Sequence, residues 1–142
     1  MPLKLTIVTP EGTRYDGEVE SVVIPGTEGD FGVLPGHERF LAPVRIGELE
    51  VRGSNDPARR WAAVSDGFAD VNAERVVVLV DSCEFAPDID EARAERARAR
   101  AERELEQLRQ AREAEHNFRV EEAALQRAIV RIQVSKKRGM AA

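Results

Sequence analysis

The chain has 142 residues, of which 42% are hydrophobic and 33% charged, so its length suits one soluble core or a small core with an appendage. Residues 1–87 hold 8 basic and 15 acidic side chains, which argues against nucleic acid as a ligand; the remainder holds 13 and 11. No apolar run approaches the roughly 18 residues of a membrane span and no signal-peptide pattern opens the chain, so we expect a cytoplasmic-side protein without direct membrane insertion.

In the first part of the chain, up to about residue 86, hydrophobic residues recur with a period of two, which is typical of strands. Turn signals such as Pro10-Glu11-Gly12 and Asp66-Gly67 separate the runs. We expect strands over residues 3–8, 19–24, 32–34, 48–52, 61–65, 68–71 and 76–80. The last of these is apolar on both faces, which favours a central position. The pattern predicts an antiparallel β-sandwich or flattened barrel over residues 1–86.

The most distinctive segment of this half runs from Gly29 to His37. Glycine adopts backbone angles closed to other residues and proline ends a sheet ladder, so we expect a turn, a very short buried strand over residues 32–34, and a second turn. So rigid a loop can present Asp30 and His37 to a partner. The triplet Asp30-Phe31-Gly32 matches the magnesium-binding triplet of protein kinases, but the other kinase motifs are missing from the sequence.

The sequence also lacks the motifs of the common catalytic and metal sites: a phosphate-binding loop, zinc-ligand spacing or a nucleophile elbow. His37 and His116 stand apart from any plausible nucleophile. Cys83 is the single cysteine, and we expect it to act as a small buried hydrophobe. We therefore expect neither an active site nor a bound metal.

A helical pattern begins at Pro87. We expect Asp88 to cap the first helix, with Glu91 as its capping-box partner. From there to about Val134 the chain has no Gly or Pro, and the helix formers Ala, Arg and Glu dominate. Two apolar stripes have helical spacing: Ile89, Ala97, Ala101, Leu105 and Leu108, then Phe118, Leu125, Ala128, Ile129 and Ile132. A helical domain over residues 87–142 is predicted.

Residues 114–117 separate the two stripes and are where a hairpin would turn. They contain no obligatory breaker, so a two-helix antiparallel hairpin and a continuous rod of ~70 Å are both open. The first stripe has only Ile89, Leu105 and Leu108 as large members, so it holds a hairpin shut only weakly. A switchable pair and a static hairpin both fit. The expected fold class is α+β, with the sandwich followed by the hairpin.

One charged cluster is a candidate ligand site. Asp90 and Arg93 open the first helix, and a hairpin would return Arg127 and Arg131 toward them. Arginines on facing helices can grip phosphates through forked hydrogen bonds, while Glu84 and Asp90 can accept from a base or ribose. Ordinary salt bridging on a charged surface explains the same residues.

Several motifs resemble the epsilon subunit of bacterial F-type ATP synthases. The segments are Gly29-Asp30-Phe31-Gly32-Val33-Leu34-Pro35-Gly36-His37, Phe40-Leu41-Ala42-Pro43-Val44-Arg45-Ile46-Gly47-Glu48-Leu49, Ser65-Asp66-Gly67-Phe68-Ala69-Asp70-Val71, Val76-Val77-Val78-Leu79-Val80-Asp81, Asp88-Ile89-Asp90-Glu91-Ala92-Arg93-Ala94 and Gln126-Arg127-Ala128-Ile129-Val130-Arg131-Ile132. The resemblance implies a non-catalytic foot of the rotating central stalk that contacts the gamma subunit and the c-ring. It implies coupling of proton translocation to ATP synthesis and a peripheral place at the cytoplasmic face of the inner membrane. By position, Asp30 and His37 would face the ring and the stalk.

The resemblance also implies regulation by the helices. In the family they can extend toward the catalytic alpha and beta subunits and inhibit ATP hydrolysis, and in some members ATP favours the folded hairpin. The family pattern Ile-Asp-x-x-Arg-Ala is met here, and the matching positions are Glu84, Ile89, Asp90, Arg93, Ala94, Arg100, Arg127 and Arg131. A regulatory ATP site is thus implied, with no cofactor required. An ATP-sensing module that works mainly by binding nucleotide, and an adaptor with a coiled-coil arm, are the alternatives.

Overall fold

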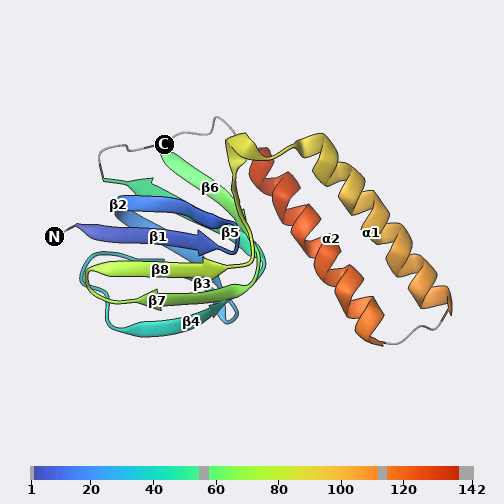
Figure 1. Ribbon diagram of the computed structural model, residues 1–142, viewed down its shortest axis with the longest axis horizontal. Helices are drawn as coiled ribbons and strands as arrows, with labels where there is room; N and C mark the ends of the chain where they lie inside the picture. Colours follow the sequence, from blue (N-terminus) through green and yellow to red (C-terminus); the bar gives the residue numbers. More distant parts are fainter. Residues whose placement is uncertain (1, 55–57, 112–114, 138–142) are drawn as a thin grey trace.

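The protein is described from a computed structural model, which covers residues 2–54, 58–111 and 115–137. A β-sandwich forms the N-terminal part, and two antiparallel helices project from one end of it (Figure 1). The predicted fold class is confirmed.

Nine strands make up the sandwich within the described residues. They are β1 (Leu3–Thr9), β2 (Gly12–Gly26), β3 (Gly29–Val33), β4 (Phe40–Val44), β5 (Gly47–Gly53), β6 (Arg59–Val64), β7 (Gly67–Val71), β8 (Arg75–Val80) and β9 (Cys83–Phe85). The strand order is β1-β8-β7-β4-β2-β5-β6-β9, with β3 paired to β2. Strand β1 pairs with β8 in parallel. It also pairs with β2, and this pairing is antiparallel, as are all the others among the described strands.

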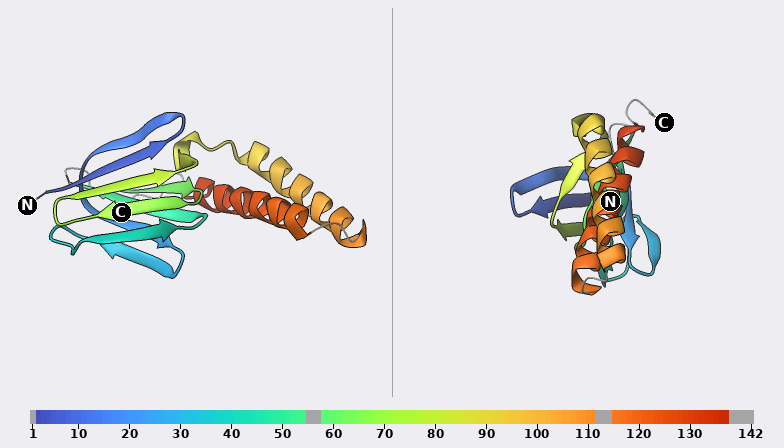
Figure 2. Two further views of the ribbon diagram at one scale, coloured as in Figure 1. Left: turned by 60° about the horizontal axis from the view of Figure 1, so that its bottom comes forward. Right: turned by 90° about the vertical axis from the view of Figure 1, so that its right-hand side faces the viewer.

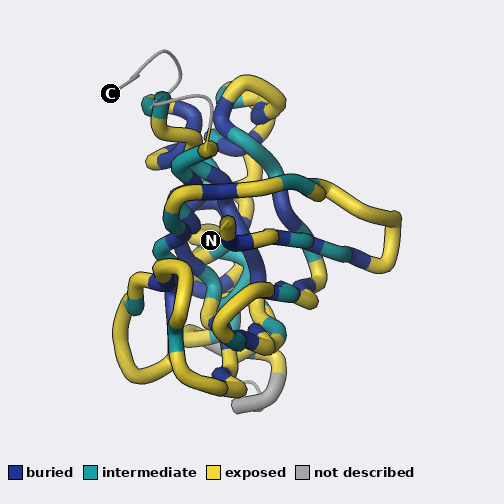
Figure 3. The backbone as a smooth tube through the Cα atoms, turned by 90° about the vertical axis from the view of Figure 1, so that its left-hand side faces the viewer, coloured by how far each residue is buried: buried dark blue, intermediate teal, exposed yellow. Residues whose placement is uncertain are grey.

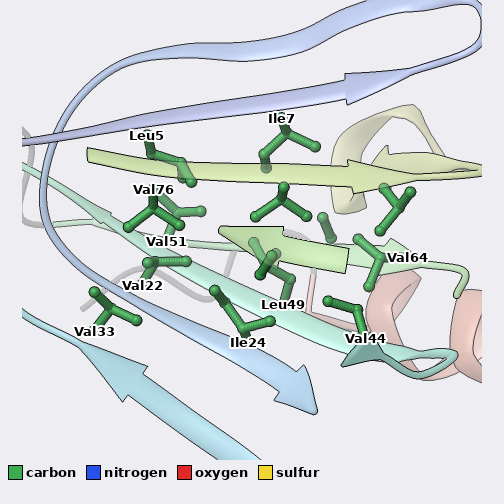
Figure 4. Packing of buried hydrophobic residues seen from close by; sticks show 14 of the residues in the cluster. Leu5, Ile7, Val22, Ile24, Val33, Val44, Leu49, Val51, Val64 and Val76 are labelled. Carbon is green, nitrogen blue, oxygen red and sulfur yellow. The ribbon is translucent and has the colours of Figure 1, made fainter. Parts of the chain in front are cut away.

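The core lies between the two layers and is built by alternate residues of each strand. On β1, Leu3, Leu5 and Ile7 are fully buried, as the period of two predicts. Leu5 and Ile7 face side chains of the same core from the other layer, such as Val22 and Leu49 (Figure 4). No residue of the two long helices belongs to this core. The sandwich therefore has a complete hydrophobic interior of its own.

Several expected strand limits were wrong. Strand β2 starts at Gly12 and continues through Pro25 and Gly26, where a stop was expected. Strand β4 was missed because Pro43 reads as a breaker, but β4 meets β2 at only one residue pair and tolerates the lost donor. Strand β9 has three residues, too few to show a period. In β3 the strand begins at Gly29, and Leu34, expected to be buried, is exposed.

Strand β8 lies between β1 and β7, as a central strand should. Its apolar composition suggested burial on both faces, but only the inner face is covered. Val76, Val78 and Val80 are buried, whereas Leu79 is 53% exposed on the outer face. Figure 3 shows the alternation of buried and exposed positions along the strands. The outer face of this layer is thus apolar and open to solvent.

The helical part begins with a 3-10 turn, η1 (Ala86–Asp88), and continues with α1 (Glu91–Ala111) and α2 (Glu115–Ser135). The expected cap, Asp88, lies inside the 3-10 turn, and Ile89 is extended with φ −84° and ψ 125°. Asp90 caps α1 instead, since its Oδ1 accepts a hydrogen bond of 3.0 Å from the N–H of Arg93. Pro87 favours the 3-10 turn η1. Because Ile89 is extended, α1 starts later, and its cap is Asp90 in place of Asp88.

The helices form the expected hairpin rather than a rod (Figure 2). Three residues of the expected turn, 115–117, belong to α2, and Ala114 lies outside the described residues. Helix α1 buries Ala94, Ala101 and Leu105, whereas Ala97 of the expected stripe is exposed. Neither helix, within the described ranges, is long and apolar enough to cross a bilayer.

A small second cluster attaches the hairpin to the sandwich. Its buried members are Ala63, Ala86, Ile89, Val130 and Val134, and Ile46 and Trp61 pack against them. We call this set the docking cluster; none of its buried members belongs to the sandwich core.

Two ion pairs flank the docking cluster. Arg131 donates to Glu84 over 2.7 Å, and Lys137 donates to Glu48 over 2.6 Å. The Lys137 ammonium also lies 5.4 Å from the centre of the Trp61 ring, within cation–π range. Each exposed or half-exposed ion pair is worth at most about 1 kcal/mol, so the attachment is modest.

Strands β7 and β8 approach closely at Gly67, and a substitution there tests this contact. A Cβ on Gly67 would lie 1.9 Å from the carbonyl oxygen of Leu79, so backbone would have to move. We expect Gly67→Ala to lower the free energy of unfolding by about 3 kcal/mol, measured by urea denaturation. The control is Gly32→Ala in β3, where a Cβ meets nothing within 4 Å. Equal denaturation midpoints for the two variants would contradict the close approach.

Candidate functional site

A pocket of about 720 Å³ lies where β9, η1, α1 and α2 meet. The residues that line it share an unusual charge: five arginines and three carboxylates, with three small apolar side chains between them. They are Glu84, Asp88, Ile89, Asp90, Arg93, Ala94, Arg96, Ala97, Arg100, Arg103 and Arg131. The net charge of the lining is +2, and the arginines lie mainly on α1.

The structure brings together seven of the eight residues that the sequence proposed for a nucleotide. Glu84, Ile89, Asp90, Arg93, Ala94, Arg100 and Arg131 all line the pocket. Arg127 is half-buried on α2 and is not among the lining residues. Sequence reasoning missed Asp88, Arg96, Ala97 and Arg103 as lining residues. The signal for the arginines was available, since positions 93, 96, 100 and 103 fall on one helix face.

The polar groups at the two ends of the pocket differ. Near the start of α1, Asp90 is engaged as the helix cap, and Asp88 lies on η1 beside it. Glu84 is held by Arg131 of α2, which leaves fewer of its lone pairs for a ligand. Along α1, every charged side chain of the lining is an arginine. The arrangement can take a hydrogen-bond donor at the carboxylate end and an anion at the arginine end.

Asp30, the first of the two expected partner contacts, lies in β3 opposite Pro25 of β2. Its carboxylate is ion-paired with Arg45, whose Nε also donates to the carbonyl of Gly26 over 3.1 Å. Ile46, the next residue, packs against the docking cluster. Asp30 therefore lies at the end of the sandwich that carries the helices.

His37 lies beyond the other end of β3. The neighbouring Gly36, with φ 87°, donates its N–H to the carbonyl of Ala73 between β7 and β8 over 2.8 Å. That turn is at the end of the sandwich away from the helices (Figure 1). The His37 ring centre is 6.4 Å from that of Phe40. The segment contains a short strand followed by a turn, as expected, but β3 separates Asp30 from His37.

An apolar outer face on strands β4, β7 and β8 was missed by sequence reasoning. Leu41, Phe68 and Leu79 are 68%, 57% and 53% exposed. In the register Phe68 lies opposite both Pro43 and Leu79, so these side chains share one face. We call it the apolar face. Exposed apolar residues that gather on one face of a domain are typical of a contact surface.

Titratable groups with nucleophilic or ligating chemistry are scarce elsewhere. Cys83 is buried in the sandwich core, as expected, and burial raises the pKa of its thiol to about 12. It is therefore an inert thiol at neutral pH. In the part of the chain that the structure describes, no three His, Cys, Asp or Glu side chains are grouped to hold a metal ion.

Comparison with solved structures finds the same fold in a chain of an ATP synthase. A chain of the Euglena gracilis mitochondrial ATP synthase, from a structure of its OSCP, F1 and c-ring, superposes with a TM-score of 0.74 at 24% identity, covering 88% of this chain and 76% of that chain. A chain of the Tetrahymena thermophila mitochondrial ATP synthase central stalk and c-ring matches with a TM-score of 0.49 at 15% identity, over 63% of this chain and 70% of that chain.

Two family descriptions together match almost the whole sequence. Residues 2–86 match "ATP synthase, Delta/Epsilon chain, beta-sandwich domain". Residues 88–136 match "ATP synthase, Delta/Epsilon chain, long alpha-helix domain". The two matches meet where the sandwich gives way to the helices, and the resemblance inferred from the sequence motifs is confirmed. This chain belongs to the delta/epsilon chain family of ATP synthases.

Proposed function

We propose that this chain is the non-catalytic epsilon-type subunit of a central stalk, which couples proton translocation through the c-ring to ATP synthesis and regulates ATP hydrolysis through its helices. The observation that carries the proposal is a sandwich with a complete core and an open apolar face, joined to a hairpin by a small separate cluster. Such a chain suits a peripheral subunit at the cytoplasmic face of the inner membrane. Residues 1–86 and 87–142 are the two working domains.

The sandwich is the part that binds the rotor. Its apolar face is the surface for the gamma subunit, since a subunit that turns with the stalk needs a contact that survives torque, and buried apolar area is the main source of such affinity. Asp30 near the start of β3 and His37 in the turn after β3 are the candidates for polar contacts with the c-ring and the stalk. The ion pair with Arg45 fixes the direction of the Asp30 carboxylate.

The contact with gamma is tested by Leu79→Glu on the apolar face. Leu79 is 53% exposed, so a charge there leaves the core intact but opposes burial against a partner. We expect co-purification of gamma with the variant to fall at least about tenfold, which corresponds to 1.4 kcal/mol or more. The matched control is Val120→Glu, a 50% exposed position on α2. Undiminished recovery of gamma with Leu79→Glu would remove this face from the interface.

The helices are the regulatory part. The hairpin is held by the docking cluster and two partly exposed ion pairs, so its release leaves the sandwich core untouched. Released helices are free to extend toward the catalytic alpha and beta subunits, and this extended form is the inhibitory one. The docked form is the one that permits hydrolysis.

Loosening and deleting the hairpin should therefore act in opposite directions. Lys137→Gln removes the ion pair to Glu48 and the contact with Trp61, favours release, and should lower ATP hydrolysis by the assembled enzyme about twofold to fivefold. The control for this variant is Lys136→Gln, at the exposed neighbouring position.

Truncation after residue 87 should instead raise ATP hydrolysis while assembly of the enzyme persists. If the truncated enzyme hydrolyses ATP at the unchanged rate, the inhibitory role falls.

The pocket is the proposed site for regulatory ATP. Its arginines come from both helices, so a phosphate chain bound there contacts α1 and Arg131 of α2 at once. Its carboxylates and small apolar residues near the start of α1 suit a base and ribose. A ligand that bridges the helices stabilises the folded hairpin by mass action, and ATP would thereby oppose inhibition.

Calorimetry on the isolated full-length chain tests this site. We expect ATP to bind and Arg93→Ala to weaken binding at least tenfold, because the variant removes a charge-assisted contact in the pocket. The matched control is Arg98→Ala, since Arg98 lies on the same helix outside the pocket and is paired with Glu95 over 2.8 Å. Equal affinities for the two variants would assign the pocket to ordinary surface charge.

A further inference from the structure

The arginines of α1 fall into two groups with different surroundings. Outside the pocket, Arg98 and Arg109 are ion-paired with glutamates three residues before them. Inside it, the side chains of Arg93, Arg96, Arg100 and Arg103 have no hydrogen-bond or ion-pair partner among the described residues. Four exposed guanidinium groups are thus left for a ligand in one groove.

Within this group, Arg96 has no carboxylate neighbour at helical spacing, and Glu104, four residues after Arg100, is not paired with it. The positions three and four residues from Arg96 hold two alanines and two arginines, so no carboxylate is within reach on the helix surface. Successive arginines at 93, 96, 100 and 103 are three or four residues apart, the spacing at which like charges repel. Glu106 follows Arg103 by three residues, but its carboxylate is engaged by Arg109 and Gln110. An anion bound along this helix face would relieve the repulsion and so stabilise the helix.

The length of the arginine row exceeds what a triphosphate needs. From position 93 to position 103 the helix rises about 15 Å, and the four arginines fall within an arc of about 80°. Of the four, only Arg93 and Arg100 were proposed for the nucleotide from the sequence. Arg96 and Arg103 add charge between and beyond these two positions, and both line the same pocket.

We propose that Arg96 and Arg103 lengthen the proposed nucleotide site into a track for polyphosphate chains, so that a nucleoside 5′-tetraphosphate binds more tightly than the triphosphate. The inference rests on the proposed nucleotide site. The base and ribose lie at the carboxylate end, near Asp88 and Asp90, and each further phosphate moves the end of the chain toward Arg103. Selectivity then follows the number of phosphates, because each adds negative charge opposite an unpaired guanidinium.

The test is calorimetry of the full-length chain with AMP, ADP, ATP and adenosine 5′-tetraphosphate, in EDTA at low salt. We expect affinity to rise at each step, with the tetraphosphate about fivefold tighter than ATP, the ratio that one exposed ion pair can supply. Arg103→Gln should bring that ratio to about one, because it weakens tetraphosphate binding more than ATP binding. Arg98→Gln, the paired arginine outside the pocket, should leave the ratio as in the wild type.

The outcomes separate this inference from the proposed function. If ATP binds but the tetraphosphate shows no gain, or if Arg103→Gln keeps the gain, the longer track is refuted and the nucleotide site stands. If no nucleotide binds but sodium tripolyphosphate and tetrapolyphosphate do, with the longer chain tighter, the track is supported and the base site is refuted. If neither nucleotides nor polyphosphates bind, both are refuted.

Discussion

The attachment of α2 to the sandwich is the interaction on which the other features depend. Full burial of Ile89, Val130 or Val134 contributes about 1.5–3 kcal/mol each, and the flanking ion pairs at most about 1 kcal/mol each. Differential binding of a few kcal/mol moves a two-state equilibrium from one side to the other. Because the docking cluster is separate from the sandwich core, the hairpin can leave without unfolding the domain that carries it.

The sandwich, in turn, has to stay rigid while one of its faces is left uncovered. Strand β2 takes part in both layers, because it pairs with β1 and also with β4. These backbone hydrogen bonds connect the layers and add to the packing of the core. Strand β8 shows how one segment serves both purposes, since alternate valines fill the core while Leu79 points outward. An apolar strand need not be covered on both sides by its own chain if a partner covers one of them.

The sequence carried the fold class because periods of two and 3.6 are dictated by backbone geometry alone. The sequence did not reveal β4 or the cap of α1, because both depend on contacts with other parts of the fold. Pro43 is tolerated because its strand has little pairing on one side, and Asp90 caps α1 because Ile89 is extended. Six of the proposed nucleotide residues line the pocket because they are close in sequence, on β9 and around the first half of α1. The hairpin brings Arg131 of α2 beside them, whereas Arg127, one turn earlier, is not among the lining residues.

Arg131 connects the pocket with the docking of the hairpin. It lines the pocket, and it also pairs with Glu84 beside the docking cluster. A phosphate that draws Arg131 away would leave the Glu84 carboxylate half-buried and facing an anion, which opposes binding. A phosphate that accepts from the remaining N–H groups of the same guanidinium would keep the ion pair and add to it, since arginine carries five donors. Only the second arrangement lets a ligand strengthen the docked state, and by linkage only then does docking strengthen the binding of the ligand.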